Sequence, residues 1–239
     1  MFRKRESFRF QRNSKNAGGA FGIKILSLEH PLVAFNFSGL DKAISKMSSW
    51  DKFFDEKIKE LAKCRRILDA GGNEPFAKEL SKYQGLFERS EYIVFDINAA
   101  PAPGVVKGDV HNLPFENESF DAFICKSVLE HVQSPQKVVD ELFRVLKKGG
   151  KGFLYVPFLF PYHAHRGFYK DYWRFSEDGV RELLKEFSKI EVQKVRGFFE
   201  TLLHFLPYLR SILIWPARLL DRFFPSKNQT SGWHVFVVK

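Results

Sequence analysis

The chain has little cysteine and no long apolar run. These two features argue against a disulfide-bonded protein and against a membrane-spanning one. Only Cys64 and Cys125 occur among its 239 residues. Cys125 lies within an apolar run, so we expect a buried thiol rather than a disulfide. No segment reaches the roughly 18 apolar residues of a membrane-spanning helix. The basic start, MFRKRESFRF, also lacks the apolar stretch of a signal peptide. We therefore expect a globular, cytoplasmic protein.

Positive charge is in excess, but it is confined to the two ends of the chain. The net charge is +10. Residues 1–24 contain seven basic residues and one acidic residue, and residues 189–227 contain seven basic and three acidic residues. Such ends attract phospholipid headgroups, nucleic acid or a phosphorylated substrate, unless they are only solvated tails. Residues 1–40 show no apolar periodicity, and we interpret them as a basic N-terminal arm.

In the remaining chain, residues 41–239, strand-like and helix-like segments alternate. Apolar residues at helical spacing predict one or two helices within 41–63. The alternation beyond them predicts an α/β fold, a Rossmann-like, doubly wound, mostly parallel sheet with an antiparallel C-terminal edge pair. The predicted strands are residues 67–70, 92–97, 105–107, 122–125, 151–156, 190–195 and 233–238, and the predicted helices among them are 76–82, 135–146 and 176–187.

Residues 198–224 form a strongly apolar segment, which we interpret as a helical insertion. Pro207 and Pro216 divide it, and each proline suits the first turn of a new short helix. On a helical wheel the charged side chains gather on one side; they are Arg210, Arg218, Asp221 and Arg222. This pattern is typical of a helix pair that lies on a membrane or covers a substrate, and not of one that spans a membrane.

Acidic residues and glycines follow the first three predicted strands. Asp69 ends the first strand before Gly71 and Gly72, Asp96 ends the second, and Asp109 follows the third. Glycines let a ligand approach the backbone closely, and carboxylates accept hydrogen bonds from ribose hydroxyls or an adenine amino group. Each feature alone also occurs as an ordinary turn. Their order after successive strands predicts a cofactor site at the carboxyl edge of the sheet.

These residues lie in a run, residues 66–179, that resembles the methyltransferase domain of the small-molecule class I branch, methyltransferase domain family 11. The run covers roughly half of the chain. Asn73 stands where the family usually has a further glycine. The resemblance implies S-adenosylmethionine as the cofactor and a methyl transfer as the reaction. The segments that carry it are ILDAGGNEP, YIVFDI, GDVHNLPFENESFDAFICKSVLEHV and ELFRVLKKGGKGFLYVP.

The resemblance also implies which part of the cofactor each strand end holds. The loop 69–73 is expected to hold the methionine part, Asp96 the ribose and Asp109 the adenine, with Val110 and Leu113 offering an apolar surface to the ring. The expected cofactor-binding residues are Asp69, Ala70, Gly71, Gly72, Asn73, Asp96, Ile97, Asp109, Val110 and Lys126.

Three other functions fit the sequence less well. A nicotinamide enzyme would use Gly-x-Gly-x-x-Gly, which the chain lacks, and Glu74 would repel a pyrophosphate but not a sulfonium. A nucleic-acid methyltransferase would carry an Asn/Asp-Pro-Pro-Tyr element where residues 126–129 read KSVL, so nucleic acid is not an expected partner. A non-catalytic, methyltransferase-like scaffold at a membrane surface remains as the alternative, although the intact set Asp69, Asp96 and Asp109 argues against it.

The methyl acceptor is expected near the loop 157–176, where polar and aromatic residues concentrate after a predicted strand. We predict His163 as the base or acceptor contact, Arg174 as an orienting residue and His131 as a second candidate base. The alternatives are a structural His131 and aromatic side chains that only pack the loop. No metal is expected, because the spacing of the histidines matches no known site. We expect a small-molecule acceptor, or one linked to a lipid or sugar at the inner face of a membrane.

Overall fold

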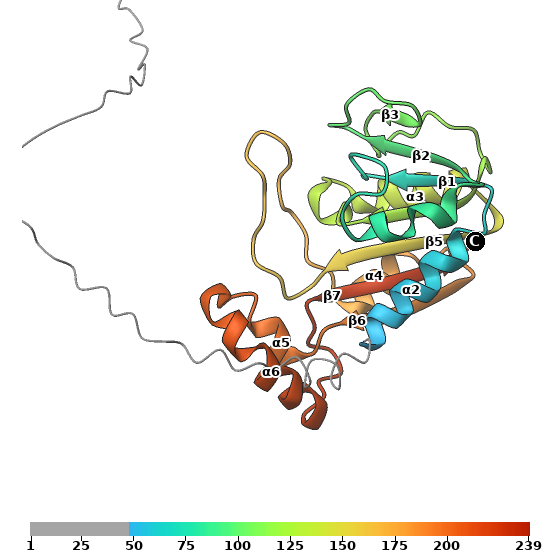
Figure 1. The fold of residues 1–239 in the computed structure, drawn as a ribbon. Helices are drawn as coiled ribbons and strands as arrows, with labels where there is room; N and C mark the ends of the chain where they lie inside the picture. Colours follow the sequence, from blue (N-terminus) through green and yellow to red (C-terminus); the bar gives the residue numbers. More distant parts are fainter. Residues whose placement is uncertain (1–47) are drawn as a thin grey trace, which may run out of the picture. The chain divides into compact units, whose positions relative to one another are not determined.

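The computed structural model describes residues 48–239, so the arm expected in residues 1–40 lies outside the described residues. Within the described residues, seven strands form one sheet (Figure 1). In spatial order the strands are β3 (Val105–Lys107), β2 (Glu91–Asp96), β1 (Arg66–Ala70), β4 (Phe120–Lys126), β5 (Leu146–Pro157), β7 (Gly232–Val238) and β6 (Lys189–Val195).

The five strands β1 to β5 pair in parallel, whereas β7 pairs antiparallel with both β5 and β6. The predicted mostly parallel sheet with an antiparallel C-terminal pair is therefore confirmed. The chain builds outward from β1 to β3 and then returns to place β4 beside β1. Sheets of this kind bind ligands at the carboxyl ends of their strands, at the point where the order reverses. That point lies here between β1 and β4.

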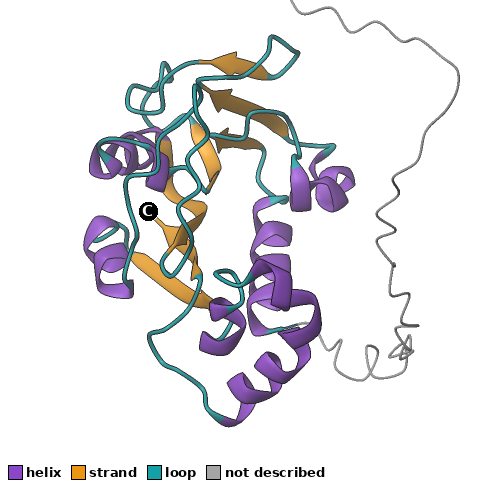
Figure 2. Cartoon of the chain, turned by 90° about the vertical axis from the view of Figure 1, so that its left-hand side faces the viewer, coloured by secondary structure: helices purple, strands orange, loops and turns teal. Residues whose placement is uncertain are grey.

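Helices cover both faces of the sheet (Figure 2). On one face, α2 (Ser49–Leu61) and the 3₁₀ helix η1 (Lys78–Phe87) pack on strands β1 and β4; on the other lie α3 (Pro135–Val145) and α4 (Glu177–Leu183). Apolar residues at helical spacing predicted a helix before the core. Three of them, Phe54, Ile58 and Leu61, are buried in α2. Buried apolar surface of this kind supplies most of a domain's stability. The two layers hold the strand ends in fixed positions.

Local signals explain where most helices begin. The Ser176 hydroxyl accepts a hydrogen bond from the Gly179 amide at 3.1 Å and caps α4, as the sequence predicts. The predicted helix 76–82 is displaced, because Phe76 and Lys78 have φ values of +55° and +53°. A left-handed backbone interrupts a right-handed helix, so η1 begins at Lys78 and continues to Phe87.

Two helices, α5 (Phe198–Leu202) and α6 (Pro207–Phe223), form the predicted apolar insertion, which we call the α5–α6 segment. Pro207 begins α6 as expected, but the expectation that Pro216 begins a further helix is wrong, because Pro216 lies inside α6. A proline in a helix leaves the carbonyl of residue i−4 without its donor. That residue is Ile212, which is 71% exposed, so water can satisfy its carbonyl and the helix continues.

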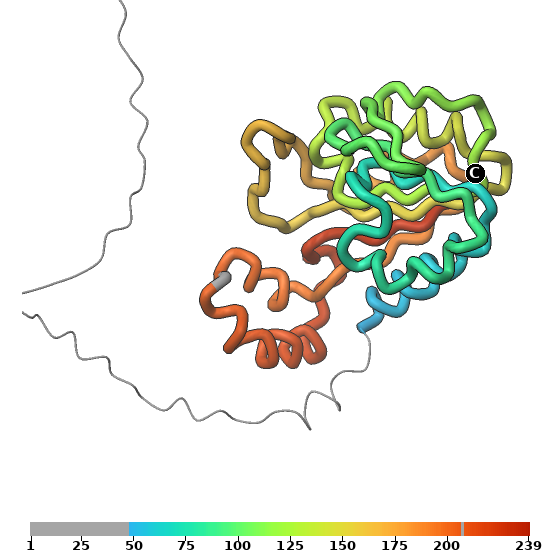
Figure 3. The backbone as a smooth tube through the Cα atoms, turned by 45° about the horizontal axis from the view of Figure 1, so that its top comes forward, coloured from blue at the N-terminus to red at the C-terminus, as the bar shows by residue number. Residues whose placement is uncertain are grey.

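The α5–α6 segment and the loop after β5 both lie at the carboxyl edge of the sheet. Because β7 is antiparallel to β5 and β6, these two strands run in the same direction, and the segments that follow them leave from one edge. Figure 3 shows the segment beside the long loop of residues 158–176. None of the helices in residues 48–239 combines the length and the apolar composition needed to cross a bilayer.

Candidate functional site

A tight turn follows β1 at the reversal point of the sheet. Gly71 has a φ of +83°, and a side chain there would collide with Val128. A side chain at Gly72 would meet the carboxylate of Asp69. Asn73 also adopts a left-handed backbone, with a φ of +57°, which asparagine tolerates better than most residues. The turn therefore depends on glycine at two positions, and the glycine that the family usually has at position 73 is replaced by a residue that can adopt the same conformation.

Asp69 is a buried acid at the end of β1. Its side chain accepts a hydrogen bond from the Tyr92 hydroxyl at 2.7 Å. Burial raises its pKa to about 6, although the bond from Tyr92 and the charge of Lys126 act in the opposite direction. A carboxyl with this pKa gains from a cation placed nearby, because the cation stabilises its charged form.

The two other acids lie at the ends of β2 and β3. Asp96 is half-buried, and its Oδ1 accepts the Asn98 amide at 2.6 Å. Ile97, which follows it, is 55% exposed. Asp109 accepts the His111 amide at 3.0 Å and lies 2.6 Å from its Nδ1, and these contacts lower the pKa of Asp109 despite the opposing effect of burial. The Asp109 carboxylate is thus ionised at neutral pH, and both side chains are at least partly accessible.

Two apolar residues expected to face the adenine ring are part of the core. Val110 is 8% exposed and Leu113 is 3% exposed, and both pack in the cluster that contains Phe95 and Phe120. Both residues therefore pack in the core next to Asp109 and help to fix the segment that follows β3.

Lys126 ends β4 and forms an ion pair with Glu79 of η1. Its ammonium group also lies 4.8 Å from the centre of the Phe54 ring. Burial lowers the pKa of Lys126, while Glu79 raises it. The structure therefore engages this side chain with Glu79, a partner that the sequence analysis did not anticipate. The ion pair ties η1 to the end of the central strand.

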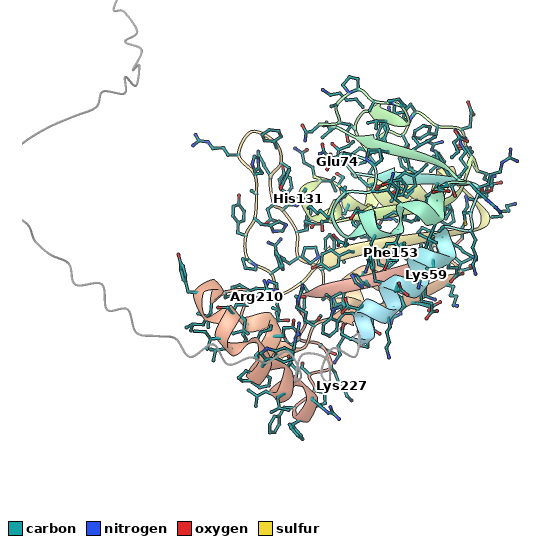
Figure 4. All side chains as sticks on the ribbon, in the orientation of Figure 1. Lys59, Glu74, His131, Phe153, Arg210 and Lys227 are labelled. Carbon is teal, nitrogen blue, oxygen red and sulfur yellow. The ribbon has the colours of Figure 1, made fainter. Side chains whose placement is uncertain are left out.

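The loop after β5, residues 158–176, packs against the turn after β4. The amides of Tyr172 and Trp173 donate to the carbonyl of Glu130 at 2.7 and 3.3 Å, and the Trp173 indole donates to the carbonyl of Val132 at 2.9 Å. In this way the loop brings residues 41 to 43 positions apart in sequence to the same edge. The His131 label in Figure 4 marks where the two segments meet.

Arg174 uses all five of its donor hydrogens inside this loop. Nε donates to the carbonyl of Phe160 at 3.1 Å, Nη1 to Asp171 and the carbonyl of Trp173, and Nη2 to Asp171 and the carbonyl of Pro161. A guanidinium has five N–H donors and no more. No donor is left for a bound molecule in this conformation, and Arg174 shapes the loop.

His163 and His131 meet around a third residue, Glu130. Their rings lie 4.8 Å apart at 75°, and the Nε2 atoms of His131 and His163 lie 3.8 and 3.9 Å from Glu130 Oε1. The Glu130 side chain is 1% exposed, and its carboxylate raises the pKa of His163 above the usual value. The sequence singled out both histidines but missed Glu130. The available signal was an acid next to His131, directly after a buried strand.

Comparison with known proteins identifies the domain. A family described as methyltransferase domain matches residues 77–154. An uncharacterized protein of Methanocaldococcus jannaschii is 29% identical over 170 residues, covering 63% of this chain and 82% of its own length. A protein of Encephalitozoon cuniculi with a provisional methyltransferase name is 42% identical over 133 residues, covering 44% of this chain and 60% of its own length.

A further relative and a solved structure extend the comparison. The 2-methyl-6-phytyl-1,4-hydroquinone methyltransferase of Arabidopsis thaliana is 35% identical over 69 residues, which is 29% of this chain and 20% of that enzyme. The crystal structure of a SAM dependent methyltransferase from Archaeoglobus fulgidus aligns with a TM-score of 0.50 at 16% identity, covering 85% of this chain and 100% of that one. This second likeness shows the shared fold.

The residues at the strand ends fit S-adenosylmethionine. The cofactor has a positive sulfonium, a ribose with two hydroxyls and no phosphate. The turn at Gly71 and Gly72 leaves room for close approach, and carboxylates end β1 and β2 and follow β3. Because the cofactor has no phosphate, the strand ends need no positively charged side chain to bind one. A methyltransferase domain therefore occupies residues 77–154, and the chain shares the fold of a SAM dependent methyltransferase, whose cofactor the residues at the strand ends fit.

Proposed function

We propose that this protein methylates an apolar, lipid-linked small molecule that it takes from a membrane surface. The observation that carries the proposal is the exposed apolar surface of the α5–α6 segment beside the acceptor side of the site. Its largest exposed side chains include Phe205, Tyr208, Ile212, Leu219, Phe223 and Phe224, which are 51% to 93% exposed. Large exposed apolar patches favour contact with membranes or apolar ligands.

One contact links this surface to the histidines. The ring of Phe160 lies 5.2 Å from the His204 ring of the α5–α6 segment and 5.1 Å from the His163 ring. A molecule that enters along the apolar segment would therefore reach the cluster of Glu130 and the two histidines. The named acceptor of the Arabidopsis relative carries a phytyl chain, which supports an acceptor of similar apolar character.

We assign the cofactor's parts to the strand ends. The turn from Asp69 to Asn73, including Ala70, holds the methionine part; Asp96 and Ile97 hold the ribose; and Asp109 holds the adenine, with Val110 behind it. Lys126, which forms an ion pair with Glu79, completes the cofactor site at the end of β4. When bound, S-adenosylmethionine supplies an activated methyl group, so the protein has to orient the acceptor and remove its proton.

Proton removal falls to the cluster of Glu130, His131 and His163. For a hydroxyl acceptor, bound S-adenosylmethionine would supply the methyl group and leave as the thioether, and the hydroxyl proton would pass to the cluster. The carboxylate of Glu130 stabilises the positive charge that this step creates on an imidazole. Arg174 and Asp171 hold the loop that presents His163.

The proposal is tested by replacing His163. Loss of a group that takes a proton costs about 10²–10⁴-fold in rate. We expect His163→Ala to reduce methyl transfer into a membrane-lipid extract by that factor while the Kd for S-adenosylmethionine changes less than about twofold. His165→Ala is the matched control, because His165 is an exposed histidine of the same loop. Equal losses of turnover in both variants, or a parallel loss of cofactor binding, would contradict the assignment.

A further inference from the structure

The carboxylate of Glu130 is buried without a hydrogen-bond partner in residues 48–239, and the nearest basic groups are the rings of His131 and His163. The side chain is 1% exposed, and neither carboxylate oxygen has a hydrogen-bond partner among the described residues. Its backbone carbonyl, in contrast, accepts from the amides of Tyr172 and Trp173. An isolated buried carboxylate is costly, and such groups are normally paired or bound to a metal. The structure therefore calls for a positively charged partner at these two oxygens.

Two imidazoles face the same carboxylate with their Nε2 atoms. These atoms lie 3.8 and 3.9 Å from Oε1, too far for a hydrogen bond and close enough for a shared ion. The Nδ1 of His131 lies 2.6 Å from the carbonyl of Lys170, and the Nδ1 of His163 lies 3.1 Å from the carbonyl of Pro161. A carbonyl oxygen only accepts, so each Nδ1 carries a hydrogen, and in the neutral imidazole each Nε2 then presents its lone pair.

This arrangement is the one found around metal-bound histidines, whose second nitrogen donates to a carbonyl or carboxylate and fixes the ring. The carboxylate of Asp171 adds to it, 3.2 Å from the Nδ1 of His163. Asp171 is in turn fixed by Arg174. The two segments that supply the ligands are also joined, since the loop after β5 hydrogen-bonds to the turn after β4.

We propose that Glu130, His131 and His163 bind one zinc ion. Two imidazoles and one carboxylate form a known zinc donor set that leaves a fourth position open. The three ligand atoms lie within 4.8 Å of one another. Zinc bonds of about 2.0–2.2 Å place tetrahedral ligand atoms roughly 3.4 Å apart. Side-chain rotations that move each ligand atom by less than about 1 Å therefore bring the three atoms to this spacing. The expectation of no metal rested on spacing in the loop alone, whereas this site takes two ligands from another segment.

The open position gives the ion a role in the reaction. A zinc-bound water or hydroxyl has a much lower pKa than the free group. A hydroxyl acceptor bound to the ion would release its proton to solvent water at neutral pH. With zinc bound, the two histidines would hold the ion, and direct proton transfer to an imidazole would apply only to the zinc-free protein. This consequence rests on the proposed function. The proposal that the site binds zinc does not rest on the proposed function, because zinc binding is measured without any methyl acceptor.

The test is a zinc titration of the full-length protein, prepared without a histidine tag and stripped with EDTA. Calorimetry with ZnCl₂ should give one equivalent for the wild type, and elemental analysis after dialysis should retain it. Loss of a metal ligand should weaken binding at least as much as the 10–100-fold cost of losing an outer partner. We therefore expect Glu130→Gln and His163→Ala to lose roughly 100-fold or more, and His165→Ala to bind like the wild type.

The thermal midpoint separates a lost site from a misfolded variant. Zinc should raise the Tm of the wild type and of His165→Ala, and leave the Tm of folded Glu130→Gln unchanged, since a ligand stabilises only a state that binds it. No zinc binding by the wild type, or equal binding by all variants, would overturn the proposal. Stoichiometric zinc without methyl transfer to lipid would leave the metal site in place and refute the proposed acceptor.

Discussion

Asp171 is held by both terminal nitrogens of Arg174, with Oδ1 2.5 Å from Nη1 and Oδ2 2.7 Å from Nη2. The same carboxylate accepts the amide of His163 at 2.8 Å. Its side chain is fully buried, and these contacts lower its pKa to about 2. The long loop after β5 is therefore ordered by its own internal pair, and the position of His163 depends on Arg174.

The first prediction concerns this pair. Arg174→Ala should destabilise the protein by about 3 kcal/mol, because it leaves a buried carboxylate without its partner. It should also lower turnover by misplacing His163, while cofactor affinity stays unchanged. Arg174→Lys keeps the charge but cannot donate to both oxygens of Asp171 in the same way. Its stability should therefore lie between those of the wild type and Arg174→Ala. Denaturant unfolding measures the first effect, and wild-type stability in Arg174→Ala would contradict the role assigned here.

The second prediction concerns the ribose contact. Asp96→Ala should weaken S-adenosylmethionine binding by about 1.5–3 kcal/mol, the range for hydrogen bonds to a charged group. Calorimetry on the purified protein measures it. Asp178→Ala is a suitable control, because Asp178 lies in the first turn of α4 on the surface. An unchanged Kd in Asp96→Ala would remove Asp96 from the cofactor site.

The third prediction follows from the pKa of about 6 at Asp69. Only the ionised carboxylate favours the sulfonium, and its fraction rises as pH rises through 6. Affinity for S-adenosylmethionine should therefore increase about 10-fold between pH 5 and pH 7. Asp69→Asn should bind weakly at both values and show no such rise. A wild-type affinity that does not vary over this range would contradict the placement of Asp69 beside the cofactor.

Asp69 also affects stability in the absence of cofactor. Its folded pKa is above the usual value of 3.8, so the folded state binds more protons than the unfolded state between about pH 4 and 6. Stability then falls as pH rises through this window and stays lower above it, by up to about 3 kcal/mol. Asp69→Asn should remove this loss. Unfolding curves at pH 4 and pH 7 test it; a stability difference that is the same in both proteins would contradict it.

The fourth prediction concerns the membrane surface. Of the charged residues expected on one side of α6, Arg218 bonds to Glu200 at 3.2 Å, and Asp221 accepts the amides of Phe199 and Glu200, both at 2.9 Å. These two residues therefore join α6 to α5. Arg210 and Arg222 are exposed. Basic residues near an anionic surface contribute about 1 kcal/mol each, so Arg210→Glu with Arg222→Glu should weaken binding to anionic vesicles by about 2 kcal/mol or more.

A matched control makes the same change in charge at the other edge of the sheet. Lys63 and Lys148 are exposed and lie just before β1 and at the start of β5. Lys63→Glu with Lys148→Glu should leave vesicle binding nearly unchanged. Replacing Ile212 and Phe223 with serine should weaken it as well, since both apolar side chains are exposed. Equal sedimentation of all four proteins would favour a segment that covers the acceptor without touching lipid.

Much of the fold could be predicted because its signals are local. Apolar runs gave the strands, and Ser176 gave the start of α4. The start of η1 could not be predicted, because it depends on left-handed backbone at Phe76 and Lys78. The prediction that Pro216 begins a helix was wrong for a similar reason. The local rule excludes proline from a helix interior, but Ile212 is exposed, so water can replace the missing donor.

The candidate site divides in the same way. The acids at the strand ends follow from their positions in the sequence, since parallel strands bring their carboxyl ends together. The pairs Lys126–Glu79 and Arg174–Asp171 and the buried Glu130 carboxylate depend on how separate segments pack. No spacing rule connects His131 with His163, which lie on different segments and meet only when the loop after β5 folds back.

The central claim is that an apolar, membrane-derived molecule is the methyl acceptor. The most direct measurement incubates the protein with S-adenosylmethionine labelled in its methyl group and with a cell extract separated into lipid and water-soluble fractions. Mass spectrometry then locates the label. We predict a labelled product in the lipid fraction with the wild type and its loss with His163→Ala. A product found only in the water-soluble fraction, or equal labelling by both proteins, would contradict the account.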